Sequence, residues 1–375
     1  MISREAKGKE IAQSANQVKR LSDQSYDVRS QTGNGFYRVV CKKFKWACSC
    51  PDHEYRAIEC KHIWAVRFSL AIRKEVQASN THIIPLLDVH SCIYCHSENI
   101  VRDGMRHNRY GDIQKWFCKT CSGYFTINLG FERMKASPQA ITSAMQLYFS
   151  GESLRNVQKF LRLQGVNVSH VAIYKWIGKY VSLMQSYLDK ITPQVSDVWR
   201  ADEIYVKMRG NPRWIFALID DETRFWIARE VADSKERHDA RNLLHTGAEL
   251  AEKKPRLFIT DGLAAYHEAY MREFFTQNRQ TEHIAHISFA SSGHHNNNKM
   301  ERFNGEIRDR EKVMRSLKKE DTPIIGGYQI YHNFIRPHMG LEGKTPAEAA
   351  GITIEGRDKW LTLIKNASKK RMVGN

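Results

Sequence analysis

The spacing of apolar side chains changes along this chain and predicts helices in its middle and strands further on. Between residues 137 and 178 apolar positions recur every three or four residues, which indicates short helices. Further on, short apolar or alternating runs predict three strands, over 198–206, 214–220 and 225–231. Helical and strand-like segments then alternate, over 235–253, 257–261 and 263–275. Strands first, followed by alternating helix and strand, predict an α/β core.

Residues 137–178 divide into three helices, each preceded by a serine that can cap it. Three short capped helices in succession predict a helix-turn-helix, whose last helix enters the major groove of DNA by its N-terminal residues. From that helix we expect DNA contacts by His170, Tyr174 and Lys175 and core positions for Val171, Ile173 and Trp176. A plain helical linker is the alternative, because short amphipathic helices are common.

Three cysteines and a histidine cluster in the first third of the chain: Cys48, Cys50, Cys60 and His62. Three thiolates and one imidazole complete a closed tetrahedral site of the structural zinc type. A turn signal at 33–35 predicts a hairpin before the cluster, and residues 63–70 predict a helix after it. Hairpin, Cys-x-Cys and then Cys-x-His at a helix start resemble a SWIM zinc finger.

Two Cys-x-x-Cys pairs, separated by 22 residues, form a second cluster: Cys92, Cys95, Cys118 and Cys121. Paired cysteines at such spacing indicate a Cys₄ zinc ribbon, and two pairs argue against a redox dithiol. Basic and aromatic side chains occupy the segment between the pairs. The remaining cysteine, Cys41, is expected to pack as a small apolar residue. The sequence therefore predicts two bound zinc ions.

The charge of the chain favours a polyanionic partner. Lys and Arg number 58 against 41 Asp and Glu, a formal net charge of +17, and binding to phosphates would release condensed counterions. Charge alone says nothing about chemistry, since many basic proteins bind nucleic acid only non-specifically. No apolar run of membrane-spanning length and no signal-peptide pattern occurs, so we expect a cytoplasmic, nucleoid-associated protein.

Three acids lie where a metal-dependent nuclease of RNase H-like fold would need them: Asp202 within a strand, Asp261 at a strand end and Glu301 at a helix start. Such oxygens can hold two Mg²⁺ (or Mn²⁺) ions that act on a phosphodiester. Glu203 competes with Asp202 for the metal-facing side of its strand, and Glu306 competes with Glu301. Asp220 and Asp221 are interpreted as turn residues. The helix from residue 301 also carries the cations Arg302, Arg308 and Lys312. We expect these side chains to hold DNA phosphates. The alternative is that they only form a salt-bridged solvated face.

Four motifs, in the expected order, resemble a DDE transposase of the insertion-sequence, integrase-related type: 202–206, 260–262, 301–310 and 331–341. The resemblance covers about residues 135–350. It implies an RNase H-like core, two divalent ions, and cleavage of transposon ends followed by strand transfer, with Asp202, Asp261 and Glu301 as the triad. The gap of 39 residues between Asp261 and Glu301 is slightly longer than in the family pattern. Histidines 294 and 295 in this gap are expected to be solvated, with contact to DNA or to the leaving group as the alternative.

The sequence thus predicts a multidomain chain of small zinc-bound α+β modules, a helix-turn-helix and an α/β RNase H-like catalytic core. The expected divisions are a SWIM-type finger (1–80), a zinc ribbon (88–130), a helix-turn-helix with its connector (135–192), the catalytic domain (195–350) and a basic tail (351–375). The expected partner is double-stranded DNA, both transposon ends and target, bound by a homodimer or higher oligomer. Two alternatives remain: a non-catalytic DNA-binding regulator derived from a transposase, and a scaffold that binds proteins through its SWIM finger.

Overall fold

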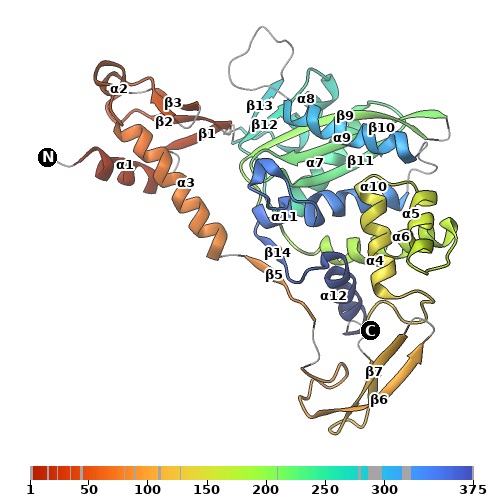
Figure 1. Cartoon of the computed structure of the whole chain (residues 1–375). Coiled ribbons are helices and arrows are strands. Elements are labelled where there is room, and N and C mark those ends of the chain that lie inside the picture. Colours follow the sequence, from red (N-terminus) through yellow and green to blue (C-terminus); the bar gives the residue numbers. More distant parts are fainter. Residues whose placement is uncertain are drawn as a thin grey trace.

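The computed structural model describes most of the chain, in the ranges 3–14, 17–22, 24–33, 35–42, 45–79, 81–87, 90–108, 111–126, 128–208, 210–277, 280–285, 298–314 and 322–373. An α/β core carries a helical unit on one side, and two small cysteine-containing modules project from this body in different directions (Figure 1). The predicted loop histidines at 294 and 295 lie outside the described residues. Of the described helices, none combines the length and apolarity that a bilayer span requires.

The core is built on a five-stranded mixed sheet with the order β11-β10-β9-β12-β13. Three antiparallel strands form one half of the sheet, and two further strands continue it in parallel to β9. The strands are β9 (Val198–Met208), β10 (Asn211–Asp220), β11 (Trp226–Ala232), β12 (Leu257–Thr260) and β13 (Glu282–Ala285). This order confirms the predicted RNase H-like arrangement, a meander followed by strands that alternate with helices.

Helices cover both faces of this sheet. On one face lie α7 (Arg237–Ala251) and α8 (Ala264–Glu273); the Tyr266 ring of α8 packs edge-on against Phe216 at 6.0 Å. The other face is covered by α9 (Asn298–Met314) and α10 (Pro323–Ile330), and Phe303 of α9 packs edge-on against Trp226 at 4.8 Å. Both faces of the sheet are therefore covered, which accounts for the nearly continuous apolar runs of β10 and β12.

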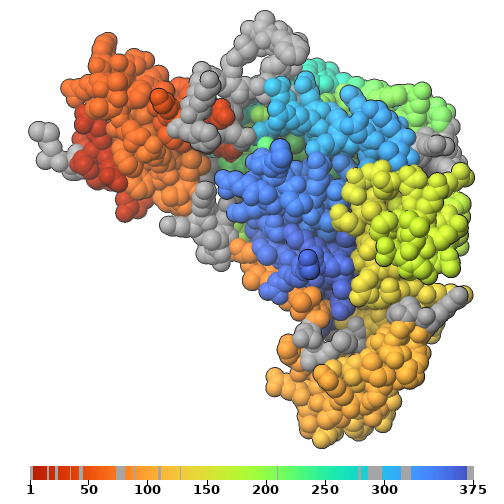
Figure 2. All heavy atoms as spheres, in the orientation of Figure 1, coloured from red at the N-terminus to blue at the C-terminus, as the bar shows by residue number. Residues whose placement is uncertain are grey.

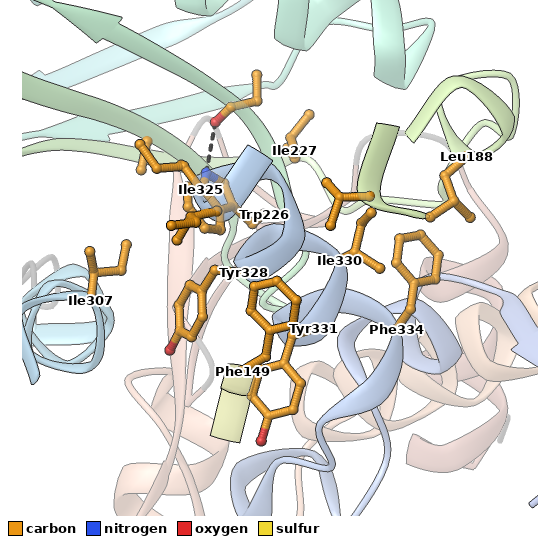
Figure 3. Close-up of a cluster of buried hydrophobic side chains, with 14 of the residues drawn as sticks. Phe149, Leu188, Trp226, Ile227, Ile307, Ile325, Tyr328, Ile330, Tyr331 and Phe334 are labelled. Atoms are coloured by element: carbon orange, nitrogen blue, oxygen red, sulfur yellow. Dashed lines mark hydrogen bonds between the residues drawn. The ribbon is translucent and has the colours of Figure 1, made fainter. Parts of the chain in front are cut away.

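The predicted helical unit consists of α4 (Pro138–Ser150), α5 (Leu154–Leu163) and α6 (His170–Leu188). Each helix begins at a serine, Ser137, Ser153 or Ser169, whose side chain accepts a hydrogen bond from the third backbone N–H beyond it. The unit shares one hydrophobic core with the sheet domain. In Figure 3, Phe149 of α4 lies against Tyr331, next to Tyr328 and Ile330.

The chain beyond α10 continues as a π-helical turn (Tyr331–Ile335), a short 3-10 turn (Met339–Leu341), α11 (Pro346–Ala349) and β14 (Ile352–Ile354). The last helix, α12 (Lys359–Val373), packs into the same core through Trp360, Leu363 and Ile364, which are 2%, 0% and 0% exposed. For this region the sequence predicted only a basic tail. β14 also pairs in parallel with β5 (His82–Ile84), so the end of the chain contacts its first third.

The N-terminal module comprises a four-stranded antiparallel sheet and three helices around a separate small core. Its elements are α1 (Arg4–Gln13), β1 (Val18–Ser22), β2 (Ser25–Arg29), β3 (Phe36–Lys42), β4 (Lys45–Cys48), α2 (Pro51–Arg56) and α3 (Lys61–Ser79). The predicted hairpin is the β2–β3 pair. The second module is a three-stranded sheet of β6 (Ile100–Asn108), β7 (Gly111–Cys118) and β8 (Tyr124–Thr126). Figure 2 shows the two modules as separate protrusions of the surface.

Candidate active site and metal centres

Two of the predicted catalytic acids lie side by side because of the register between β9 and β12. Leu257 pairs with Val198 and Ile259 with Arg200 in a parallel ladder, so Asp261, just beyond β12, stands beside Asp202. One carboxylate oxygen each from Asp202, Glu203 and Asp261 lies within 4.8 Å of the others. Such a group of acids is typical of a divalent-cation site built from oxygen ligands.

Asp202 is oriented by two hydrogen bonds that involve both of its oxygens. The backbone N–H of Glu203 donates to Oδ1 at 2.8 Å, and the side chain of Asn304 donates to Oδ2 at 2.8 Å. Burial, followed by the charge of Glu203, raises the pKa of Asp202 to about 7. The side chain is therefore poorly accommodated as an anion by its surroundings alone, and a cation beside it would relieve this cost.

Glu203 belongs to the acidic group although the sequence presented it only as a competitor of Asp202. It is 8% exposed, and its Oε1 accepts a hydrogen bond from Lys235 Nζ at 2.5 Å. Its Oε2 is buried, and the Tyr266 hydroxyl group interacts with this carboxylate. Burial raises the pKa of Glu203 as well. Three carboxylates this close together, one of them buried, fit a cation bound nearby that would offset their repulsion.

Glu301 lies on the first turn of α9, is exposed, and is not part of the acidic group found among the described residues. One turn later on the same helix, Asn304 contacts Asp202. Residues three apart are neighbours on a helix surface, about 5–6 Å apart at Cβ. The helix that carries Glu301 is therefore docked beside Asp202 through Asn304.

The other acids weighed on the sequence have separate roles. Glu306 forms an ion pair with Arg336 at 2.5 Å. Asp220 is fully buried and organises the turn after β10, accepting hydrogen bonds from the backbone and hydroxyl groups of Ser196 and Thr223 at 2.5 to 2.8 Å. Asp221 is fully buried too, but it forms ion pairs with residues distant in the sequence, so it is more than a turn residue.

The first cysteine cluster is buried within the N-terminal module, and one ligand atom from each member lies within 4.8 Å of the others. Cys48 ends β4, Cys50 precedes α2, and Cys60 and His62 stand at the start of α3. Nδ1 of His62 lies 3.8 Å from the sulfur atoms of both Cys48 and Cys60. A hydrogen bond from Cys48 lowers the pKa of Cys60. Convergence of three sulfurs and one imidazole nitrogen fits a structural zinc ion.

The second cluster joins two turns of the second module. The sulfur of Cys92 lies 3.6 Å from that of Cys121, and the sulfur of Cys95 lies 3.5 Å from that of Cys118. Four thiolates around one zinc ion would be about 3.8 Å apart, as follows from tetrahedral geometry with Zn–S distances of about 2.3 Å. These distances fit a shared ion better than disulfides, whose S–S bond is about 2.05 Å. Cys41 is half-buried and lies outside both clusters.

The residues predicted to contact DNA lie at the surface or close to it. On α6, Lys175 is exposed and His170 and Tyr174 are half-buried, while Ile173 and Trp176 belong to the core as predicted. Val171, predicted to be a core residue, is 48% exposed, because it occupies the outer face of the first turn. The predicted cations of α9 are all exposed: Arg302, Arg308 and Lys312.

Part of the chain is similar to a known domain family and to known transposases. Residues 196–338 match the family model of a DDE domain, that of the IS240 transposases. Two Staphylococcus aureus proteins, the transposase for insertion sequence-like element IS431mec (strain N315) and the transposase for IS257 in transposon Tn4003, are each 28% identical over 104 residues. This alignment covers 27% of the present chain and 46% of either relative, so the chain spans less than half the length of these curated relatives.

Part of the chain is also similar to solved structures, at low sequence identity. The HTLV-2 integrase catalytic core domain in complex with magnesium is similar with 15% identity and a TM-score of 0.30, covering 42% of this chain and 95% of that one. A chain of the simian T-cell lymphotropic virus intasome in complex with the PP2A regulatory subunit B56 gamma has 14% identity and a TM-score of 0.32, covering 54% and 72%.

Proposed function

We propose that this chain is a DNA transposase, which binds the ends of a mobile element, cleaves the DNA there and joins it to a target. The observation that carries the proposal is the juxtaposition of Asp202 and Asp261 on neighbouring strands, inside the segment that matches a DDE domain. The similarity of part of the chain to transposases of insertion sequences supports the same reaction class.

Asp202, Asp261 and Glu301 would hold two Mg²⁺ or Mn²⁺ ions, which when bound activate the attacking hydroxyl and neutralise charge on the leaving oxygen. Asn304 and the Glu203 backbone keep both oxygens of Asp202 in place for this purpose. Water would be the nucleophile for cleavage and a 3′-hydroxyl for strand transfer. This chemistry needs no covalent intermediate with the protein.

Glu301, and not Glu203, is proposed as the third ligand. Lys235 already compensates the charge of Glu203 through a 2.5 Å contact. Glu301 lies one helical turn from Asn304, so a change of rotamer brings its carboxylate towards Asp202 once cations offset the repulsion. Glu203 would then act behind the metal ligands, as a buried acid that supports the site.

The remaining modules would recognise DNA. The proposed assignments are a SWIM-type finger and a zinc ribbon, each with one zinc ion, and a helix-turn-helix that reads the transposon end through α6. Arg302, Arg308 and Lys312 would hold substrate phosphates beside the acids. Synapsis of two ends requires a homodimer or a higher oligomer on DNA, and a reaction on chromosomal DNA places the protein in the cytoplasm at the nucleoid.

A metal-dependent nicking assay tests this function directly. The substrate is DNA flanking the gene that contains a candidate inverted repeat, with Mg²⁺ or Mn²⁺ added to zinc-loaded protein. Glu301→Gln should abolish nicking, while Glu306→Gln on the same helix should retain it, because Glu306 pairs with Arg336. Binding of the repeat without nicking by the unmodified protein would favour the alternative, a non-catalytic regulator.

A further inference from the structure

Asp221 is a buried carboxylate that joins parts of the chain far apart in the sequence. It follows β10 directly and is 0% exposed. Its side chain accepts a hydrogen bond from Arg200 Nε and lies 3.0 Å from Lys299 Nζ, which also donates to the Asp221 carbonyl oxygen at 2.8 Å. Burial by itself would raise the pKa of Asp221, but Arg200, Lys299 and Arg20 together lower it to about 2.

The two cations that contact Asp221 belong to the elements that carry proposed metal ligands. Arg200 precedes Asp202 by two positions on β9 and therefore shares its face of the sheet. Lys299 precedes Glu301 by two positions on α9. The first turn of α9 is thus fixed to the core at Lys299 through Asp221, and again at Asn304 through Asp202. Glu301 lies between these two anchors.

The N-terminal module contributes a third cation to this network. Arg20 of β1 forms an ion pair with Glu222, the residue after Asp221, and both side chains are largely buried, 9% and 19% exposed. Its neighbour Lys19 also contacts the core, through a 2.6 Å ion pair with Glu282, but there the side chains are 40% and 54% exposed. Arg20 therefore reaches the buried network, whereas Lys19 makes a solvated contact beside it.

We propose that Asp221 is a positioning residue for the catalytic metal site, and that Arg20 links the docked N-terminal module to the same buried ion-pair network. The inference rests on the proposed function, because it concerns the placement of Glu301 as a metal ligand. In this account Asp221 holds the N-terminal turn of α9 against β9, so that Glu301 remains within reach of Asp202. The N-terminal module then has two roles, binding its own zinc ion and completing the active site of the same chain.

The test compares Lys299→Ala and Arg20→Ala with the matched control Lys19→Ala in the full-length, zinc-loaded protein. Binding of Mn²⁺ is measured by electron paramagnetic resonance, with Asp261→Asn as the blank, and cleavage is measured over a range of Mn²⁺ concentrations. Loss of a residue that contacts a metal ligand directly typically weakens metal binding 10–100-fold. Lys299 and Arg20 act one step further from the ligands, so we expect effects at or below the lower end of this range, about 10-fold weaker Mn²⁺ binding for Lys299→Ala and about 3-fold for Arg20→Ala. Lys19→Ala should match the unmodified protein in both measurements.

High Mn²⁺ should restore cleavage by Lys299→Ala, and its DNA affinity should stay unchanged, which a general folding defect would not allow. Asp221→Asn serves as a second variant and should show the Lys299→Ala defect more strongly. If Lys299→Ala binds Mn²⁺ as tightly as Lys19→Ala does, the positioning role of Asp221 is refuted. If only Arg20→Ala behaves like Lys19→Ala, the participation of the N-terminal module is refuted. Absence of cleavage by the unmodified protein, with Mn²⁺ bound, would instead overturn the proposed function.

Discussion

Replacement of Asp202 by Asn should stabilise the protein in magnesium-free buffer, although it removes a proposed catalytic ligand. The charge of Asp202 is unfavourable in the folded state because the side chain is buried and lies beside Glu203 and Asp261. The substitution keeps the size of the side chain and removes the charge. The new amide can accept from the Glu203 backbone and donate to Asn304 Oδ1, which has no partner among the described residues.

The magnitude follows from the pKa of Asp202, which is raised from 3.8 to about 7. At about 1.36 kcal/mol per pKa unit, the ionised group costs the folded state about 4 kcal/mol at pH 8. At pH 5 the cost is about 1.7 kcal/mol, because the folded state still keeps its proton while the unfolded state has mostly lost it. The cost is absent below the unfolded pKa, grows as the pH rises, and is complete above about 7.

The assay is urea denaturation at pH 5 and pH 8, followed by tryptophan fluorescence, since Trp199 and Trp226 are fully buried in the core. No chelator is used, because a chelator would also remove zinc. Asp202→Asn should raise the free energy of unfolding at pH 8 clearly more than at pH 5. Added Mg²⁺ should stabilise the unmodified protein and not the variant. Two results would contradict the unfavourable charge of Asp202 in the folded state. One is a variant that is less stable than the unmodified protein at pH 8, and the other is an equal gain in the free energy of unfolding at both pH values.

Two further predictions concern the modules outside the catalytic core. Metal analysis of the purified protein should find two zinc ions per chain. Cys118→Ser should lose one of these ions, and Cys41→Ser should lose none. A content well under two zinc ions per chain would contradict both assignments. Lys175→Ala should weaken binding to the transposon end and reduce the slope of log affinity against log salt by about one, if Lys175 contacts a phosphate. An unchanged slope in a salt titration would exclude Lys175 from the interface.

The architecture of the core could be predicted because its signals are local. The apolar runs of the strands and the serine caps at Ser137, Ser153 and Ser169 depend on neighbours in the sequence, and the elements lie close to where these signals put them. The helix α12 carried a local signal too: Trp360, Leu363 and Ile364 have helical spacing, but the surrounding lysines and arginines suggested a tail.

The details of the site could not be predicted, because they depend on pairings between distant segments. Adjacent strand residues point to opposite faces of a sheet, so Glu203 was not expected to lie beside both Asp202 and Asp261. In the structure β12 already ends at Thr260, and the long Glu203 side chain reaches both acids near that strand end. Asp221 was interpreted as a turn residue, since its partners Arg200 and Lys299 lie 21 and 78 positions away. The parallel pairing of β5 with β14 has no local signal in three-residue strands.

The variant Asp261→Asn tests whether Asp202, Asp261 and Glu301 hold the cations for phosphoryl transfer. This change keeps the size of the side chain and can keep its hydrogen bond from the Leu263 backbone, but it removes the charge that would hold the cations. The measurement is the single-turnover rate of cleavage of a transposon end in Mg²⁺, together with the affinity for the same DNA. We expect no detectable cleavage or strand transfer by Asp261→Asn and nearly unchanged DNA affinity. Cleavage by Asp261→Asn at the rate of the unmodified protein would contradict the assignment of the metal-binding acids.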